Sequence, residues 1–242
     1  MIGQPSAGSA TRRALRRTRF MTDVNAMPAA ERSRAAMHAT DLLVQEHDLI
    51  LRGLAVLGRL AWLAQQAPQE APAIVEPPFP VADGRAMVTF LRELADGRHH
   101  AKEEQVLFPA LEAAGIARSG GPLGCMLAEH DHGRAAIRAM DAALSAAASD
   151  PGAWRTFAVA AHTYVHLLSA HIYKENNVLF RMAEQALGPA EDPRLMAAYA
   201  AAERTSGLAE TATYVTLLEQ LEARYPAASA TPNARELDGA HP

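Results

Sequence analysis

The sequence predicts an all-α protein built around an up-down-up-down four-helix bundle. Hydrophobic residues make up 49% of the 242 residues, and much of that share is Ala, a strong helix former. Aromatic residues make up only 5%, and runs of β-branched residues are scarce, which disfavours an all-β fold. Apolar residues recur at helical spacing in four long stretches that breaker residues separate.

Each predicted helix has recognisable ends. The Pro-rich stretch 68–80 ends the first helix and forms the one long connection of the bundle. Gly115 ends the second helix, Pro122 suits the first turn of the third, and Gly188-Pro189 ends the fourth. The predicted helices cover residues 33–67, 83–114, 122–148 and 150–187.

Further segments flank the predicted bundle. We expect a disordered basic N-terminal extension at 1–32, the bundle at 33–188, a C-terminal helical extension at 189–225 and a disordered tail at 226–242. The extension could hold two helices, at about 193–204 and 208–225, that pack outside the bundle or against a second chain. The sequence therefore allows a homodimer formed through the C-terminal helices.

Two passages of the chain nearly repeat each other. Residues 99–108 and 171–180 share the pattern His-x-x-Lys-Glu-x-x-Val-Leu-Phe without a gap. Each is preceded by a shorter repeat, Glu46-His47-Asp48 or Glu129-His130-Asp131. The short repeats fall on predicted helices one and three, and the long repeats on helices two and four. A bundle with an internal pseudo-twofold repeat would bring all four to one central layer.

The repeated residues are typical metal ligands. A His and a Glu four residues apart lie on one face of a helix, and here that face is otherwise apolar, so the pair points into the core. A buried carboxylate without compensation is strongly unfavourable, and metal coordination can compensate it. The predicted ligands are one His from every helix and one Glu from helices two and four: His47, His99, Glu103, His130, His171 and Glu175.

This ligand set exceeds the four ligands of a tetrahedral zinc ion. Two six-coordinate metals with bridging carboxylates fit it better, and imidazole with carboxylate suits iron or manganese. A second register on helix two, His100 with Glu104, satisfies the same spacing. The ungapped match to helix four favours His99 and Glu103, so we expect His100 and Glu104 to lie beside the site or to face solvent.

Composition excludes several other classes of protein. A formal net charge of −4 gives no electrostatic basis for binding nucleic acid. No apolar run approaches the length needed to span a bilayer, so we expect no membrane partner. The single cysteine, Cys125, excludes a disulfide scaffold; it fits a cytoplasmic protein and is expected to be a small core residue.

Residues 99–109, 120–131 and 171–180 resemble the hemerythrin family, the HHE cation-binding domain, and the resemblance covers about residues 40–187. It implies a four-helix bundle that holds a non-haem di-iron centre, with two iron ions joined by carboxylates and an oxo or hydroxo bridge. The ligands that it implies are the six residues named above.

The chain departs from this resemblance at one position. Oxygen-carrying hemerythrins have a second His four residues after the third-helix His, where this chain has Arg134. The four-His set is more similar to bacterial di-iron proteins linked to nitric oxide response and to repair of iron–sulfur centres. The expected function is binding of O2, NO or a peroxide in oxidative or nitrosative stress. An iron-dependent regulatory module and an iron donor for iron–sulfur repair are the alternatives, and enzymatic turnover stays open.

Overall fold

The computed structural model describes residues 37–66, 79–150 and 152–226. All its helices belong to one compact unit, His38–Pro242. The described residues form helices and connections only, which confirms the predicted all-α class. The expected N-terminal extension and most of the expected C-terminal tail lie outside the described residues, so both stay predictions.

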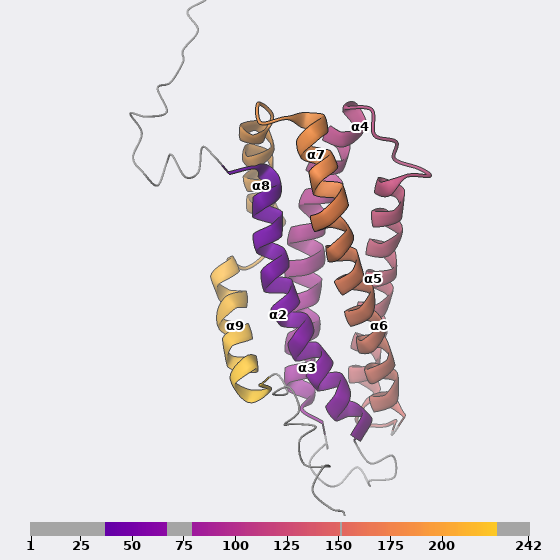
Figure 1. Ribbon diagram of the computed structural model, residues 1–242. Helices are drawn as coiled ribbons and strands as arrows, with labels where there is room; N and C mark the ends of the chain where they lie inside the picture. The colour runs from indigo at the N-terminus through magenta and orange to yellow at the C-terminus, as the bar shows by residue number, and fades with distance from the viewer. Residues whose placement is uncertain (1–36, 67–78, 151, 227–242) are drawn as a thin grey trace, which may run out of the picture. The chain divides into compact units, whose positions relative to one another are not determined.

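Four long helical rods pack side by side in the described part of the chain (Figure 1). The first is α2, Ala39–Gln66. The third is α5, Pro122–Ala146. The second rod runs through α3 (Val81–Phe90), η2 (Leu91–His100), η3 (Glu103–Leu107) and α4 (Phe108–Ala113), and the fourth through α6 (Ala153–Lys174), η4 (Glu175–Leu179) and α7 (Phe180–Leu187).

The segments η2, η3 and η4 are π-helical, which the sequence analysis did not anticipate. A π-turn hydrogen-bonds from i to i+5 instead of i to i+4, so it shifts the phase of the side chains along the helix. η3 begins at Glu103 and η4 at Glu175, the equivalent residues of the sequence repeat. The irregular turns therefore fall on both halves of the repeat at the same place.

The apolar core consists of two clusters with a polar layer between them. One cluster contains Ile50, Leu94 and Leu168, and the other contains Leu43 and Leu179. The buried histidines and glutamates occupy the positions between these clusters on each rod. Packing on both sides thus holds the polar layer away from water.

Two further helices, α8 (Asp192–Ser206) and α9 (Thr211–Arg224), pack against the bundle. Gly207 lies between them with φ of 67°, a left-handed conformation that glycine adopts without strain. Leu195 and Tyr199 of α8 and Leu218 and Leu221 of α9 are buried in the two core clusters.

Polar contacts add to the docking of α9. Arg224 Nη1 donates to Asp83 Oδ1 at 2.6 Å, and Arg52 Nη2 donates to Glu222 Oε2 at 2.7 Å. Asp83, in the first turn of α3, therefore anchors α9. The two helices use their apolar faces on their own chain, and a homodimer through them stays a prediction.

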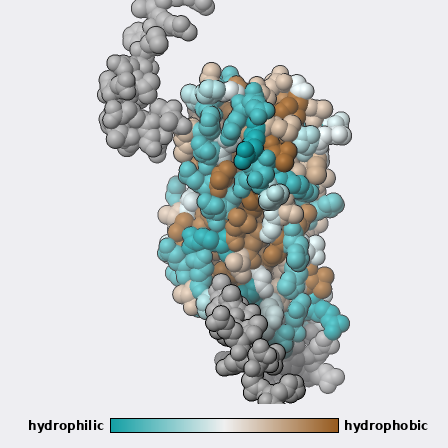
Figure 2. All heavy atoms as spheres, in the orientation of Figure 1, coloured by the Kyte–Doolittle hydropathy of each residue, from teal (hydrophilic) through white to brown (hydrophobic). Residues whose placement is uncertain are grey.

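The surface of the described unit is mixed in character. Hydrophilic and apolar residues alternate over the face that Figure 2 shows. Cys125 is exposed, which corrects its expected place in the core: it stands on the outward side of α5, five residues before His130. Among the described residues, no helix is long and apolar enough to cross a membrane.

We expect Gly53→Ala to destabilise the protein by about 1–3 kcal/mol, because overpacking a full core forces side chains and backbone to move. A Cβ at Gly53 would lie 2.4 Å from Cε1 of Phe90, a fully buried ring. Gly58→Ala on the same helix is the control: its Cβ meets nothing within 4 Å. It should stabilise by about 0.5–1 kcal/mol through helix propensity. Urea unfolding measures the stability of both variants. Equal effects would contradict the close packing of Gly53 against Phe90.

Candidate metal centre

Seven buried side chains converge in the polar layer. They come from all four rods of the bundle, and the π-helical segments contribute four of them. The set consists of His47 on α2, His99 and His100 on η2, Glu103 on η3, His130 on α5, His171 on α6 and Glu175 on η4. All six residues that the sequence singled out are in this layer, together with His100.

The seven side chains form two overlapping groups, each with its donor atoms within 4.8 Å of one another. We call the first the two-histidine half: His47 and His99, with Glu103 and Glu175. We call the second the three-histidine half: His100, His130 and His171, with Glu103. Glu103 is common to both halves.

The two carboxylates each face both halves. Glu103 Oε1 lies 3.6 Å from His99 Nε2, and its Oε2 lies 3.5 Å from His130 Nε2. Glu175 Oε2 lies 3.1 Å from His47 Nε2, and its Oε1 lies 3.1 Å from His171 Nε2. Each carboxylate thus turns one oxygen to either side, which is the arrangement of a bridging ligand.

Most inward atoms of this layer contact one another only as ion pairs and have no hydrogen-bond partner, and this is the test of whether metal ions fit. Among the described residues, no hydrogen bond satisfies Nε2 of His47, His99 or His100, or any carboxylate oxygen of Glu103 or Glu175. Buried polar atoms are rarely left unsatisfied, because each costs about 1–3 kcal/mol. One cation in each half would satisfy all these atoms together, so the donor set fits two metal ions.

The outward nitrogen of each histidine has an acceptor. Hydrogen bonding at Nδ1 sets the tautomer that leaves Nε2 free as a ligand, as is usual for metal-bound histidines. The five contacts at Nδ1 are His47 to Asn176 at 2.7 Å, His99 to Glu46 at 3.1 Å, His100 to Asp96 at 3.4 Å, His130 to Glu104 at 2.7 Å and His171 to Glu129 at 2.9 Å.

With Nδ1 protonated, two inward nitrogens would face each other as acceptors. His130 Nε2 and His171 Nε2 are 3.1 Å apart. Two lone pairs at this separation repel unless a proton or a cation lies between them. A metal ion in the three-histidine half would remove this repulsion.

Two of the carboxylates that support the histidines, Glu46 and Glu129, were not identified from the sequence as part of the site. Glu46 supports His99 and accepts from Lys102, whereas Glu129 supports His171 and accepts from Lys174. These residues occupy equivalent places in the sequence repeat. The sequence repeat could have identified them. It keeps a Glu directly before the His of the first and third helices, and a Lys directly before the Glu ligand of the second and fourth.

Arg134 lies outside the inward layer and organises its surroundings. Its Nη1 donates to Asp96 at 2.9 Å and to Glu104 at 3.0 Å. These carboxylates contact Nδ1 of His100 and of His130. Arg134 therefore fixes two of the three acceptors of the three-histidine half, those of His100 and His130, and contributes no ligand atom to it.

Burial and mutual repulsion set the protonation of the layer. Burial, together with the nearby charge of Glu175, raises the pKa of Glu103 well above its ordinary value. Burial acts in the same direction on Glu175, but contacts with His171 and His47 outweigh it and hold the pKa of that carboxyl well below its usual range. Burial and the neighbouring His47 lower the pKa of His99 to about 4, so His99 is neutral at pH 7.

His100 lies differently from the expectation, whereas Glu104 agrees with it. His100 is buried in the three-histidine half, with its ring stacked on that of His130 at a centroid distance of 3.8 Å. The expectation assumed α-helical phase, in which neighbouring side chains diverge by a large angle; the π-helical segment η2 turns both His99 and His100 inward. Glu104 does lie beside the site, as expected, where it supports His130.

We expect Glu103→Leu to stabilise the metal-free protein by about 1–3 kcal/mol, because it removes a buried, unsatisfied carboxyl group. Metal ions should no longer raise its melting temperature, whereas they should raise that of the unaltered protein. Glu104→Leu is the matched control and should destabilise the metal-free protein, because it removes the acceptor of His130 and Arg134. Calorimetry with and without Fe²⁺ measures the melting temperatures of both variants. If Glu103→Leu destabilised the metal-free protein, the layer would be a network of ion pairs that stabilises the fold without metal.

Comparison with known proteins agrees with this geometry. The chain is similar to the iron–sulfur cluster repair protein YtfE of Yersinia pseudotuberculosis serotype IB and to that of Yersinia pestis strain Pestoides F. Identity is 30% over 111 residues in both cases, which covers 45% of this chain and 49% of the relative. The chain therefore aligns with about half the length of these relatives. No solved structure matched the chain.

The family model of the hemerythrin HHE cation binding domain matches residues 38–183. This range contains the first three rods, the fourth rod as far as residue 183 and all seven side chains of the polar layer, and it ends before α8. The chain belongs to the hemerythrin HHE cation-binding family.

Proposed function

We propose that this protein holds two iron ions in the polar layer and binds O2, NO or a peroxide there. The supporting observation is the set of unsatisfied inward atoms, which divides into two groups around shared carboxylates. The proposed ligands are His47 and His99 for one ion and His100, His130 and His171 for the other. Glu103 and Glu175, with an oxo or hydroxo bridge, would join the two ions.

Iron is proposed because of the chemistry of the donors. Imidazole with carboxylate suits iron or manganese, while sites without thiolate disfavour soft metals. Five imidazoles and two carboxylates also exceed what a single tetrahedral zinc ion takes. Bound iron would supply positions for a small ligand and the capacity to change oxidation state.

The unequal halves favour ligand binding on one side. The three-histidine half offers one more imidazole than the two-histidine half. Arg134 stands on α5 beside the half that contains His130, where oxygen-carrying hemerythrins have a further His. His100 occupies that half, so we propose that the open position belongs to the ion held by His47 and His99. The apolar clusters on both sides would keep bulk water from it.

Anaerobic loading with Fe²⁺ should give about two irons per chain. Subsequent exposure to air, and separately to NO, should change the absorption spectrum, because the small ligand occupies a position on iron. Iron analysis and optical spectra measure this. A single tightly held zinc ion, or no metal at all, would refute the proposal.

His100→Ala should lower iron content toward about one per chain at limiting Fe²⁺, because the three-histidine half loses an imidazole. A loss of at least about 10-fold in affinity for that ion is expected, since even contacts behind the ligands are worth that much. His132→Ala on α5 is the control, because its side chain is exposed and lies outside both groups. If both variants bind iron like the unaltered protein, His100 is not a ligand.

A second candidate function is delivery of iron to damaged iron–sulfur centres. It is favoured by the similarity to the iron–sulfur cluster repair proteins YtfE, which this chain matches over about half their length. Transfer of iron from the loaded protein to a cluster-free iron–sulfur protein, compared with free Fe²⁺ at the same concentration, tests it. We also propose that the protein is cytoplasmic. A regulatory role for the C-terminal helices is a further proposal.

A further inference from the structure

One lysine of the sequence repeat is fully buried beside the metal centre. Lys102 has no exposed side-chain surface, and its ammonium group is ion-paired with Glu46 and with Glu203. Glu46 belongs to the bundle, whereas Glu203 lies on α8, beyond the range that the family model matches. A helix outside the family domain therefore supplies a charge that this buried lysine requires.

These contacts lead directly to a proposed ligand. Glu46 uses one oxygen for Lys102 and the other for His99 Nδ1, at 3.1 Å. His99 Nε2 then faces the metal centre, 3.6 Å from Glu103 Oε1. A continuous chain of polar contacts thus runs from Glu203 through Lys102 and Glu46 to His99.

The other half of the repeat provides an internal comparison. Lys174 pairs with Glu129, which in turn holds His171 Nδ1 at 2.9 Å. There the side chain of Lys174 is 38% exposed, so solvent screens its charge. The same contacts from Lys to Glu to His therefore lie beside solvent in one half of the repeat and beneath α8 in the other.

The burial of Lys102 makes its second partner important. A buried ammonium group is stable only when its charges and hydrogen bonds are compensated, and removal of one partner of a buried pair is strongly destabilising. Without Glu203, Lys102 would either move toward water or draw Glu46 closer to itself. Both movements would alter the contact of Glu46 with His99.

α8 is held in place at this point by more than one contact. Arg98, itself almost fully buried, lies with Nη1 3.4 Å from Glu203 Oε1, and its Nη2 donates to the carbonyl oxygen of Ala209 at 2.6 Å. Tyr199, one turn before Glu203, is buried in the core cluster that contains Leu107. Side-chain register on α8 thus places Tyr199 and Glu203 on the face toward the site.

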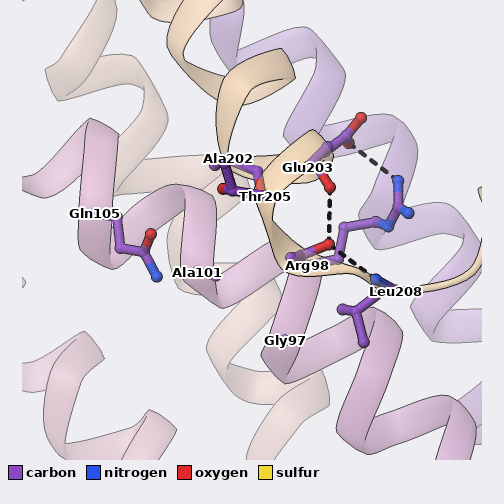
Figure 3. A pocket seen from close by; sticks show the side chains of 9 residues that line it. Gly97, Arg98, Ala101, Gln105, Ala202, Glu203, Thr205 and Leu208 are labelled. Carbon is purple, nitrogen blue, oxygen red and sulfur yellow. Dashed lines mark hydrogen bonds and ion pairs between the residues drawn. The ribbon is translucent and has the colours of Figure 1, made fainter.

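A pocket of about 310 Å³ opens beside these contacts. Figure 3 shows Arg98 and Gln105 of the second rod and Ala202 and Glu203 of α8 lining it, with Arg98 in contact with Glu203. The side chain of Glu203 is 32% exposed, so solvent reaches the outer end of the contact chain here. Lys102 itself stays covered.

We propose that Glu203 is a positioning residue for His99, through which docking of α8 is coupled to metal retention in the two-histidine half. The inference rests on the proposed function, because it requires that this layer binds metal. Coupling of this kind is reciprocal: α8 strengthens metal binding, and bound metal strengthens the docking of α8.

The test uses Glu203→Gln in the full chain, loaded anaerobically with ⁵⁷Fe²⁺. Chelator competition should show one iron released about 10-fold or more readily than in the unaltered protein, with the other unchanged. Mössbauer spectra should show a change at one of the two irons. Glu203→Asp should restore part of the retention, because it restores the charge.

Glu210→Gln is the matched control, because it removes the same charge at an exposed position in the connection between α8 and α9. It should retain both irons. Hydrogen exchange should be slower in α8 after iron loading of the unaltered protein, and this protection should diminish in Glu203→Gln. A merely structural role for Glu203 would not produce a change confined to one iron.

Three results would overturn the inference. If the unaltered protein holds two irons and Glu203→Gln releases both at unchanged rates, the inference fails while the proposed function stands. Equally faster release of both irons from Glu203→Gln would assign Glu203 a general structural role. Failure of the unaltered protein to hold two irons would remove the proposed function and the inference together.

Discussion

The withdrawal of seven metal-ligating side chains from water is the constraint on which the rest of this structure depends. Five imidazoles and two carboxylates lie in one layer between two apolar clusters, and most of their inward atoms have no hydrogen-bond partner among the described residues. Such a layer is unfavourable by itself, since buried polar atoms lose their hydration without recovering hydrogen bonds. The apolar packing on either side must offset this cost in the metal-free protein, and bound cations would remove it.

The outer contacts make the layer usable for metal binding. Each histidine is fixed at Nδ1 by an acceptor from another helix or from a neighbouring turn. The ring orientations and tautomers are therefore set before any ion arrives, which lowers the entropic cost of binding. The four carboxylates among these acceptors are in turn held by Lys102, Lys174 and Arg134, so negative and positive charges alternate outward from these histidines.

The C-terminal helices make the two halves of a repeated sequence unequal. α8 covers the half that contains Lys102, while the equivalent Lys174 remains partly open to solvent. The family model ends at residue 183, so this difference arises from a segment beyond the shared domain. Two nearly identical sequence passages thus acquire different dielectric surroundings, and this is a physical route by which one ion of a pair could be held differently from the other.

The sequence by itself determined the helical class, the approximate limits of the four rods and six of the seven inward residues, because hydrophobic period and ligand spacing are local properties. His100 could not be placed in this way: its orientation depends on the π-helical phase of η2, which the packing of whole helices decides. The burial of Lys102 and the contact with Glu203 also required the tertiary structure, since about one hundred residues separate the two in the chain. Local pattern specifies which side chains face inward, but only the docking of distant helices decides which of their charges remain in contact with water.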